Sequence, residues 1–214
     1  MEIIYGTRNA AKLSSMRVCL SRLKPECDID VVGLDEIGAA TPDVDEDGND
    51  PLENARKKAS AYYSALKRPV FSVDSGLYFD GLPDELQPGL FIRRVGGKRL
   101  TDDGMIEYYA NLAAEHGGTL TARYVNGICL IMNESLIYEH TGDDIATCRF
   151  IMCSKPHSRR VEGFPLDSLS LHIGSGAYFY DRPGTRFDKE MVYSTDEGFR
   201  GFFKAAYNDY VTMR

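Results

Sequence analysis

The sequence lacks the cysteine and histidine patterns that build disulfide frameworks and zinc sites. Its five cysteines are odd in number and form no CxxC pair, and its four histidines show no HxxxH spacing. These residues are Cys19, Cys27, Cys129, Cys148, Cys153, His116, His140, His157 and His172. We therefore expect a reduced, cytoplasmic protein without a zinc site.

The chain also lacks a basic excess and a long hydrophobic run. Its formal net charge of −7 argues against nucleic acid as a bulk partner, because phosphate backbones reward a basic face. A nucleotide is compatible with this charge, since a few lysines and a divalent metal can balance it. No apolar segment is long enough to span a bilayer, and Arg8 and Lys12 precede any long apolar run, so we expect neither a membrane partner nor a signal peptide.

The composition is that of a globular protein, with 43% hydrophobic and 27% charged residues. The 214 residues suffice for one large domain or two small ones. We find no internal repeat, low-complexity segment or clear linker. We therefore expect a single domain over residues 1–214, an α/β fold whose sheet carries a β-rich extension.

The N-terminal segment predicts a strand, a tight polar loop and a helix. Residues 3–5 suit a buried strand, and the apolar residues after the loop follow at helical spacing. Gly6 permits a sharp turn, and Thr7 and Asn9 suit the free N–H groups that open a helix. Lys12 adds a positive charge one turn in, which favours phosphate binding. An ordinary capped helix with a solvated Lys12 explains the same residues.

An acidic loop at residues 41–50 leads into a well-marked helix. Its carboxylates suit either a solvated loop or a supply of oxygen ligands for Mg²⁺. Asp50 as N-cap and Glu53 three residues later predict a capping box. Asn54 and Lys58 then lie one helical turn apart, so both can reach one ligand, although a solvated helix flank is the ordinary fate of such residues.

The strand predicted at residues 70–73 should stop at the turn Asp74-Ser75-Gly76. An Asp at the carboxyl end of a strand lies where α/β folds place their chemistry. The alternative is a turn Asp that bonds its own backbone. The long loop from Gly81 to Gly97 is of a length that is usually functional or disordered.

The second half of the chain differs from the first, because most of its predicted elements are strands. A helix is predicted at residues 101–115, then strands at 119–132, 136–140 and 145–152 in an antiparallel meander. A final helix is predicted at residues 195–213.

Four motifs occur along the chain in a fixed order: Thr-x-Asn-x-x-Lys, Glu-x-Gly followed by Glu-Asn-Ala-x-x-Lys-Ala, Asp-Ser-Gly-Leu, and Pro-Gly-x-x-x-x-Arg. Their residues are Thr7, Asn9, Lys12, Glu46, Gly48, Glu53, Asn54, Ala55, Lys58, Ala59, Asp74, Ser75, Gly76, Leu77, Pro88, Gly89 and Arg94. In this order they resemble the Ham1-type inosine triphosphate pyrophosphatases over most of the chain. Several ordered motifs are far more specific than any one alone.

The resemblance implies a hydrolase that converts a nucleoside triphosphate to the monophosphate and pyrophosphate. The implied substrates are deaminated purine nucleotides such as ITP, dITP and XTP. The implied fold is an elongated mixed α/β sheet with two lobes and a central nucleotide cleft, and the implied assembly is a homodimer.

The resemblance also implies roles for particular residues. Lys12, Lys58 and the backbone amides after Gly6 would hold the phosphates. Glu46 and Asp74 would ligate Mg²⁺, and Asp74 would position or deprotonate the water that attacks the α-phosphorus. The remaining substrate contacts implied are Thr7, Asn9, Asn54, Ser75, Gly76, Arg94, Tyr178, Tyr180, Asp181 and Arg200.

The chain departs from the family pattern beside its main carboxylate. A second acid normally precedes the Asp of the Asp-Ser-Gly turn, and this chain has Val73. The loss of that acid should weaken magnesium binding unless Asp45 or Asp47 takes its place.

The base-reading positions depart as well. The family's Ser-His-Arg aligns with Gly198-Phe199-Arg200, and the Lys expected six residues before Arg200 is Ser194. Arg200 is then the remaining donor for a 6-keto group. The aromatic residues of Tyr178-Phe179-Tyr180-Asp181 keep base stacking in place.

Three functions follow from this comparison. The first is an active Mg²⁺-dependent pyrophosphatase. The second is a noncatalytic nucleotide-binding or regulatory relative, and the third is a pyrophosphatase for a different modified or pyrimidine nucleotide. The first and third are favoured, because the phosphate and water-positioning residues are better kept than the base-reading ones.

Overall fold

The computed structural model describes residues 1–181 and 186–213, with residues 186–194 described by their backbone alone. In this description the chain forms two compact units. Unit 1 comprises residues 1–75, 125–146 and 195–213, and unit 2 comprises residues 76–124 and the described part of 147–194. The single domain expected over residues 1–214 stays a prediction.

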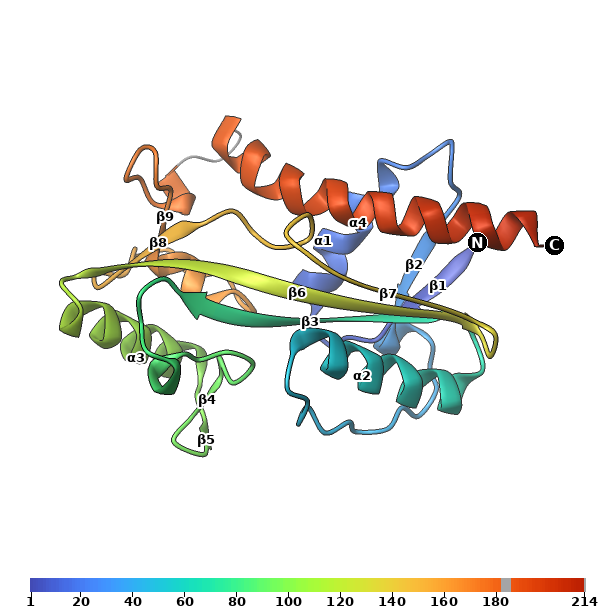
Figure 1. Ribbon diagram of the computed structural model, residues 1–214, viewed down its shortest axis with the longest axis horizontal. Helices are drawn as coiled ribbons and strands as arrows, with labels where there is room; N and C mark the ends of the chain where they lie inside the picture. The colour runs from blue at the N-terminus through green and yellow to red at the C-terminus, as the bar shows by residue number, and fades with distance from the viewer. Residues whose placement is uncertain (182–185, 214) are drawn as a thin grey trace. The chain divides into compact units, whose positions relative to one another are not determined.

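A mixed β-sheet runs through the described chain (Figure 1). Its strands are β1 (Glu2–Tyr5), β2 (Asp30–Gly33), β3 (Val70–Phe79), β6 (Thr119–Asn133), β7 (Leu136–Thr141), β8 (Phe150–Cys153) and β9 (Ser170–Leu171). They lie in the order β2-β1-β3-β6-β8-β9, and β7 pairs with β6 outside this path. β1 pairs in parallel with β2 and β3, whereas the β6–β7, β6–β8 and β8–β9 pairs are antiparallel. The predicted mixed α/β fold is confirmed.

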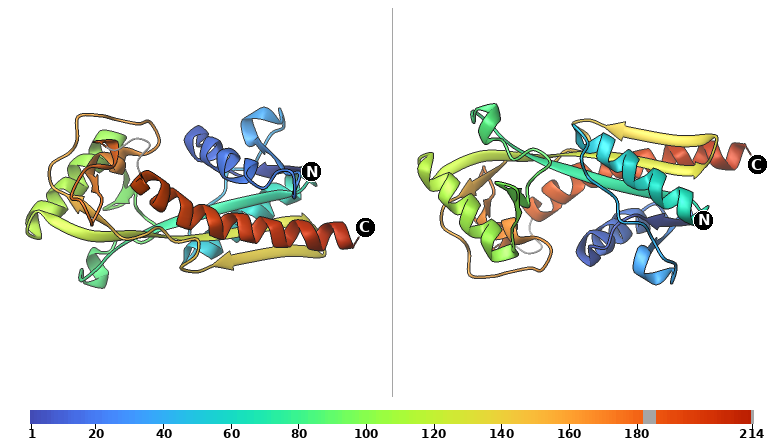
Figure 2. Two further views of the ribbon diagram at one scale, coloured as in Figure 1. Left: turned by 90° about the horizontal axis from the view of Figure 1, so that it is seen from above. Right: turned by 90° about the horizontal axis from the view of Figure 1, so that it is seen from below.

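In unit 1, helices cover both faces of the sheet (Figures 1 and 2). These helices are α1 (Ala10–Ser21), α2 (Pro51–Leu66) and α4 (Arg186–Thr212). α1 and α4 share one core with the sheet, in which Met16, Leu20, Phe71, Phe199 and Phe203 are all buried. The apolar stripe of α2 packs on the other face, against β1, β3 and β6. A short 3₁₀ turn, η1 (Leu34–Glu36), follows β2.

In unit 2, one long helix covers the sheet. This helix is α3 (Asp102–Glu115), and it buries Ile106, Tyr109 and Leu112 against β6 and β8. Thr101, the first residue of the predicted helix, is its N-cap, since its Oγ1 accepts the N–H of Gly104 at 3.1 Å. The smaller elements of unit 2 are η2 (Asp84–Leu86), the hairpin of β4 (Arg94–Val95) and β5 (Lys98–Arg99), η3 (Pro165–Leu169) and η4 (Phe179–Asp181).

The structure corrects the predicted end of the strand at Asp74. β3 continues through Asp74, Ser75 and Gly76 to Phe79 as one strand. The sequence Asp-Ser-Gly favours a turn because Asp can bond its own backbone. Here side chains of α2 hold the Asp74 carboxylate instead, as described below, so the backbone stays extended.

Two element boundaries and one capping bond also differ clearly from the predictions. The strand expected at residues 145–152 is only β8, because Ile145 is buried in a turn whose carbonyl accepts from a side chain of β6. α4 begins before residue 195. The N-cap of α2 is Asp50 as predicted, but Glu53 accepts the N–H of Asn49 at 2.9 Å, so the reciprocal half of the capping box is made one residue earlier.

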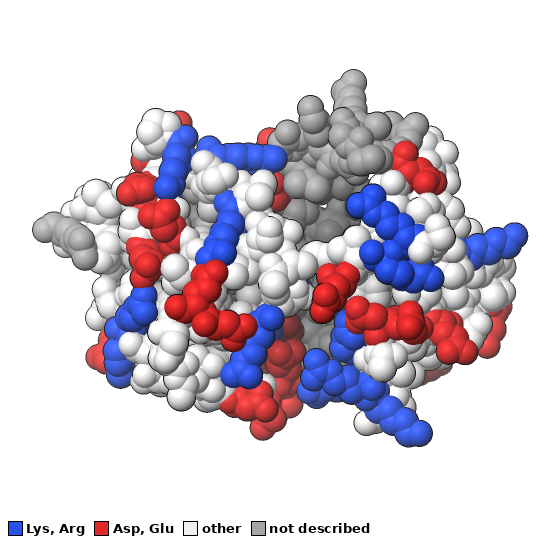
Figure 3. Space-filling view, turned by 180° about the vertical axis from the view of Figure 1, so that it is seen from behind, with Lys and Arg blue, Asp and Glu red and all other residues white. Residues whose placement is uncertain are grey.

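Among the described residues, no helix combines the length and apolar character needed to cross a bilayer. All five cysteines lie in the described part of the chain, and none forms a disulfide. On the face drawn in Figure 3, acidic and basic side chains lie next to one another. That visible face therefore presents mixed charge rather than a broad basic surface.

Candidate active site

Asp74 is a buried carboxylate in the middle of β3. Side chains alternate between the two faces of a strand. Phe71 and Val73 enter the core shared with α1 and α4. Asp74 therefore points to the opposite face, toward α2, and its side chain is 11% exposed.

Two side chains of α2 hold the two oxygens of Asp74. Lys58 Nζ lies 2.8 Å from Oδ1, and Asn54 Nδ2 donates to Oδ2 at 2.9 Å. Both side chains are buried, and they lie one helical turn apart as the sequence predicts. A buried carboxylate is stable only with a counter-charge and hydrogen bonds. Lys58 and Asn54 supply these, and they fix the direction in which Asp74 points.

The acidic loop joins this cluster through Gly48 and Glu46. The N–H of Gly48 donates to Asn54 Oδ1 at 2.8 Å, so Asn54 links the loop to Asp74. A Cβ at Gly48 would lie 2.6 Å from that amide oxygen, so only glycine allows this approach. Glu46 then lies 3.5 Å from Lys58 Nζ with 47% of its side chain exposed. The loop thus places a second carboxylate at the exposed side of the cluster.

The loop before α1 is closed by its own hydrogen bonds. Asn9 caps α1, because its Oδ1 accepts the N–H groups of Ala11 and Lys12 at 2.9 and 3.1 Å. The N–H of Asn9 donates to Thr7 Oγ1, and those of Gly6 and Thr7 donate to backbone carbonyls. The amides of Thr7, Asn9, Ala11 and Lys12, which the resemblance implies for phosphate, thus have acceptors within the chain. Thr7 and Asn9 shape the loop, and the substrate contacts implied for them and for the loop amides stay predictions.

The charges of the neighbouring Lys58, Asp74 and Glu46 affect the pKa of Lys12. Loss of water around its ammonium group lowers the pKa of Lys12, and repulsion from Lys58 lowers it further. The carboxylates of Asp74 and Glu46 act in the opposite direction. An added anion would favour the charged form of both lysines. We call these five residues, Lys12, Glu46, Asn54, Lys58 and Asp74, the Lys58 cluster. Its two lysines give it the positive charge to bind a phosphate.

Ser75 is held by a residue that sequence reasoning missed. Its Oγ donates to Asn126 Oδ1 at 2.6 Å, and Asn126 Nδ2 donates to the carbonyl of Ile145 at 2.7 Å. Asn126 is buried in strand β6, two residues before an apolar run from Ile128 to Met132. A polar residue at the start of this buried run was the one available indication of its role. Asn126 fixes the Ser75 hydroxyl on the face of β3 opposite the Asp74 carboxylate.

The carboxylates of the cluster fit a divalent metal as partial ligands. Glu46 and Asp74 already converge on one cation, the ammonium of Lys58. Mg²⁺ is often held by one or two carboxylates, with phosphate oxygens and water completing its shell. In the described part of the chain, no three His, Cys, Asp or Glu side chains gather to hold a metal by themselves. The residues present suit a metal that arrives with a phosphate.

Val73 does not face this cluster. It is 9% exposed and packs in the core on the opposite face of β3 from Asp74. Its apolar side chain therefore suits its surroundings. Of the two acids considered as replacements, Asp47 pairs with Lys57 at 2.9 Å on the surface, and Asp45 is exposed.

Unit 2 holds the residues predicted to stack on the base. Phe179 turns into the core of unit 2. Tyr178, Tyr180 and Asp181 instead all contact His157, a residue that no sequence pattern indicated.

Two further predicted substrate residues lie in unit 2. Gly76 continues β3, and a Cβ there would lie 2.7 Å from the ring of Tyr78. Arg94 is exposed in β4. Neither position is linked to the Lys58 cluster by a described contact.

The predicted base-reading residues of α4 belong to unit 1. Phe199 is 7% exposed and lies in the core. Arg200 Nη1 lies 3.8 Å from Asp196 Oδ2, and its side chain is 17% exposed. Arg200 is therefore held along its own helix and is not part of the Lys58 cluster. Ser194 lies outside the residues whose side chains are described.

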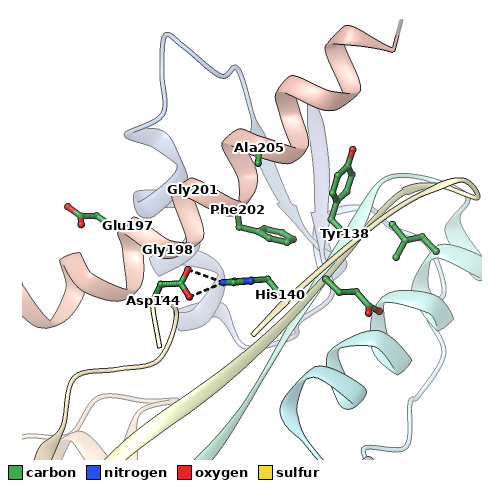
Figure 4. Close-up of a pocket in the computed structure, with 10 residues that line it drawn as sticks. Tyr138, His140, Asp144, Glu197, Gly198, Gly201, Phe202 and Ala205 are labelled. Atoms are coloured by element: carbon green, nitrogen blue, oxygen red, sulfur yellow. Dashed lines mark hydrogen bonds and ion pairs between the residues drawn. The ribbon is translucent and has the colours of Figure 1, made fainter. Parts of the chain in front are cut away.

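A hollow of about 760 Å³ lies elsewhere in unit 1, between β7 and α4 (Figure 4). His140 Nε2 lies 2.9 Å from both carboxylate oxygens of Asp144 on its wall. Gly198 of α4 passes close to this wall, because a Cβ there would lie 2.2 Å from the carbonyl oxygen of Asp144. The residues that line it include none predicted for phosphate or metal, so the hollow is separate from the Lys58 cluster.

The fold and this site define an α/β protein with a buried lysine–carboxylate cluster. The model of the Ham1 family matches residues 3–147, and the chain belongs to that family. It is 32% identical over 142 residues to a dITP/XTP pyrophosphatase of Rhodopseudomonas palustris, and the match covers 64% of each chain. It is 31% identical over 130 residues to a dITP/XTP pyrophosphatase of Staphylococcus aureus, with 61% of this chain and 60% of that protein covered. The chain thus spans less than two thirds of these relatives.

Solved structures share the fold over nearly the whole length. A Ham1 protein from Coxiella burnetii superposes with a TM-score of 0.66 and 22% identity, covering 100% of both chains. The Ham1 protein of Staphylococcus aureus gives a TM-score of 0.65 and 21% identity, covering 94% of this chain and 99% of that one. At this identity the likeness establishes the fold.

Proposed function

We propose that this protein is a Mg²⁺-dependent nucleoside triphosphate pyrophosphatase for deaminated purine nucleotides such as ITP, dITP and XTP. The observation that carries the proposal is the buried Lys58–Asp74–Asn54 arrangement with Lys12 and Glu46 beside it, in a chain of the Ham1 family. The substrate class is supported by the names of the similar proteins.

The two lysines would hold the triphosphate. Phosphate oxygens would give the desolvated ammonium of Lys12 a nearby anionic partner, and they would compete with Asp74 for Lys58. Once Lys58 bonds phosphate, one oxygen of Asp74 becomes available to a water molecule. Asn54 keeps the other oxygen in place, so the carboxylate does not turn away. Thr7 and Asn9 would keep the loop before α1 in shape around the phosphates.

Asp74 would then direct the chemical step. It accepts a hydrogen bond from the water and takes its proton as the water oxygen bonds the α-phosphorus. The bond from the α-phosphorus to the bridging oxygen breaks, and pyrophosphate leaves with the electron pair. The products are the nucleoside monophosphate and pyrophosphate, and the positive charges of Lys12 and Lys58 stabilise the negative charge of the leaving group.

Glu46 and Asp74 would hold Mg²⁺ together with the phosphate oxygens. When bound, the metal neutralises charge on those oxygens and polarises the phosphorus under attack. Gly76 and the backbone of Ser75, whose side chain Asn126 holds on the opposite face of β3, would lie beside the substrate.

The remaining contacts complete the proposal. Tyr178 and Tyr180 would stack on the base with Asp181 beside them, and Arg94 and Arg200 would contribute donors. A homodimer and a cytoplasmic location are also proposed, the latter supported by five cysteines without disulfides. Nucleic acid and membranes are not proposed as partners.

A second candidate is a pyrophosphatase for a different base. It is favoured by Phe199, which is buried in the core where the family resemblance expects a base-reading histidine. This candidate shares the phosphate chemistry above and differs only in the preferred base.

Pyrophosphate release from a panel of nucleoside triphosphates tests both candidates. With Mg²⁺, we expect release from ITP or XTP in preference to ATP and CTP. Asp74→Asn should lower kcat by roughly 100-fold or more, whereas Asp47→Asn, a surface change in the acidic loop, should not. No release from any nucleotide, with binding retained, would leave a noncatalytic nucleotide-binding protein.

A further inference from the structure

His157 is the point on which the predicted base-stacking residues of unit 2 converge. The centroid of its ring lies 5.2 Å from that of Tyr178 and 5.5 Å from that of Tyr180. The guanidinium carbon of Arg159 lies 5.1 Å from the Tyr180 centroid. Phe179 anchors this segment in the core.

The His157 ring is fixed in orientation by its own segment. Its backbone N–H donates to the carbonyl of Ser168 at 2.7 Å, and its Nδ1 accepts the backbone N–H of Arg159 at 3.0 Å. Because Nδ1 accepts, the proton of the neutral ring resides on Nε2. His157 therefore presents one defined donor, Nε2–H.

Asp181 is the acceptor that pairs with this donor. His157 Nε2 lies 3.1 Å from Asp181 Oδ1. The two side chains differ in exposure, at 22% for His157 and 52% for Asp181. The histidine is thus held while the carboxylate can rotate into solvent, so another polar group can enter between them.

We propose that His157 and Asp181 together read the lactam edge of the substrate's base, with His157 as a specificity-determining residue. A 6-keto purine carries a carbonyl oxygen next to a ring N–H. His157 Nε2–H would donate to the carbonyl, the ring N–H would donate to Asp181, and Tyr178 and Tyr180 would contact the base through their rings. The pair supplies the histidine donor that Phe199, buried in unit 1, cannot give.

The same pair would disfavour bases with the opposite pattern. Adenine offers an amino donor where His157 also donates, and a ring acceptor where Asp181 also accepts. Cytosine has the same reversed edge, whereas uracil and guanine carry the lactam. Unpaired polar groups in a binding site are costly, so a mismatch at both atoms gives discrimination. The inference takes from the proposed function only that the Tyr178–Asp181 segment holds a base.

Calorimetric binding of nucleoside monophosphates tests this independently of turnover. We expect IMP to bind roughly tenfold or more tightly than AMP, and UMP more tightly than CMP. His157→Phe keeps an aromatic ring but removes the donor, and it should bring the IMP-to-AMP ratio close to one. His157→Gln keeps a donor and should retain part of the preference. His116→Phe, at the end of α3, is the matched control and should change nothing.

Asp181→Leu provides a second variant, because this exposed side chain can be changed without disturbing the core. It should also remove the preference for IMP. The inference is overturned if the unmodified protein does not prefer IMP, or if folded His157→Phe and Asp181→Leu proteins keep its preference. Pyrophosphate release with an unchanged base preference in the variants would leave the proposed function standing and remove this inference. A changed base preference in these variants of a protein that shows no turnover would support this inference and remove the proposed function.

Discussion

At the scale of single residues, the candidate site buries charged side chains, which lowers the stability of the unliganded protein. A bound polyanion would offset this cost by pairing with the two lysines. Lys58 and Asp74 pair at 2.8 Å, each with about a tenth of its side chain exposed. Lys12 stands beside another lysine, and burial lowers its pKa. An unliganded protein keeps such an arrangement at a cost in stability, which is a common property of binding sites.

The first prediction concerns Lys12. Because Lys12 is desolvated and lies near Lys58, Lys12→Met should leave the melting temperature of the unliganded protein unchanged or higher. The same variant should bind inorganic tripolyphosphate roughly tenfold or more weakly, since a charge-assisted contact is lost. Thermal denaturation and calorimetry measure the two effects.

The control for this prediction is Lys57→Met. Lys57 lies on α2, the helix that also carries Lys58, but it pairs with Asp47 and Glu53 at the surface. Tripolyphosphate affinity should be nearly unchanged in this variant. A destabilised Lys12→Met protein with full tripolyphosphate affinity would show that Lys12 has only a structural role.

At the scale of elements, the site depends on close approach of β3, α2 and the loop before α1. Gly6 is the tightest point of that loop: a Cβ there would lie 2.2 Å from Ser72 Oγ and 2.6 Å from the Tyr62 ring. The sequence suggested a turn as the reason for this glycine. The structure gives a different reason, since it is lack of space that excludes a side chain.

The second prediction follows from this contact. Gly6→Ala should destabilise the protein by about 2 kcal/mol or more, because the new methyl group displaces Ser72 and Tyr62. Gly201→Ala is the matched control, since Gly201 lies inside α4 and a Cβ there would meet no described atom beyond its own helical turn within 4 Å. That control should stabilise the protein by about 0.5–1 kcal/mol. Urea denaturation measures both, and equal effects would contradict the packing argument.

The sequence predicted those elements whose determinants are local. The cap at Asp50, the helix that corresponds to α3 and the strand β6 all depend on residues a few positions apart, and they agree with the structure. β3 was predicted to break at Asp74 because the partners that keep it extended, Asn54 and Lys58, lie 20 and 16 residues away.

The residues of the candidate site also fall into those that the sequence could predict and those that it could not. The sequence predicted that Asn54 and Lys58 would lie one helical turn apart, and the family resemblance implied that Asp74 shares their site, as the structure places them. The motifs could not predict Asn126, which reaches Ser75 across 51 residues, or His157, which reaches Asp181 across 24. Neither partner carries a local pattern, so only the folded chain brings them together.

At the scale of the whole molecule, stability should depend on pH through Asp167, a partly buried carboxylate. Burial raises the pKa of Asp167, in η3, from its ordinary value of 3.8 to about 6. The folded protein therefore holds this proton more tightly than the unfolded chain. The contribution of Asp167 to stability is unchanged below about pH 4, falls as the pH rises from about 4 to 6, and is fully lost above that.

The third prediction is that removing the Asp167 carboxylate stabilises the protein above the pKa of this group. Asp167→Asn should stabilise the protein by about 1–3 kcal/mol at pH 8, because the buried charge is removed. At pH 4 the variant and the unmodified protein should be nearly equally stable. Asp84→Asn, an exposed change in η2, should show no such pH-dependent gain. Denaturant unfolding at the two pH values measures this, and a gain of equal size at pH 4 would contradict the burial argument.

The proposed reaction makes the most direct claim about the whole molecule, namely that water held by Asp74 attacks the α-phosphorus. Turnover of ITP in ¹⁸O-labelled water, followed by mass spectrometry of both products, tests it. The account predicts that the label enters the monophosphate and is absent from pyrophosphate, and that Asp74→Asn removes the labelled product. Label in pyrophosphate, or release of single phosphate groups, would contradict it.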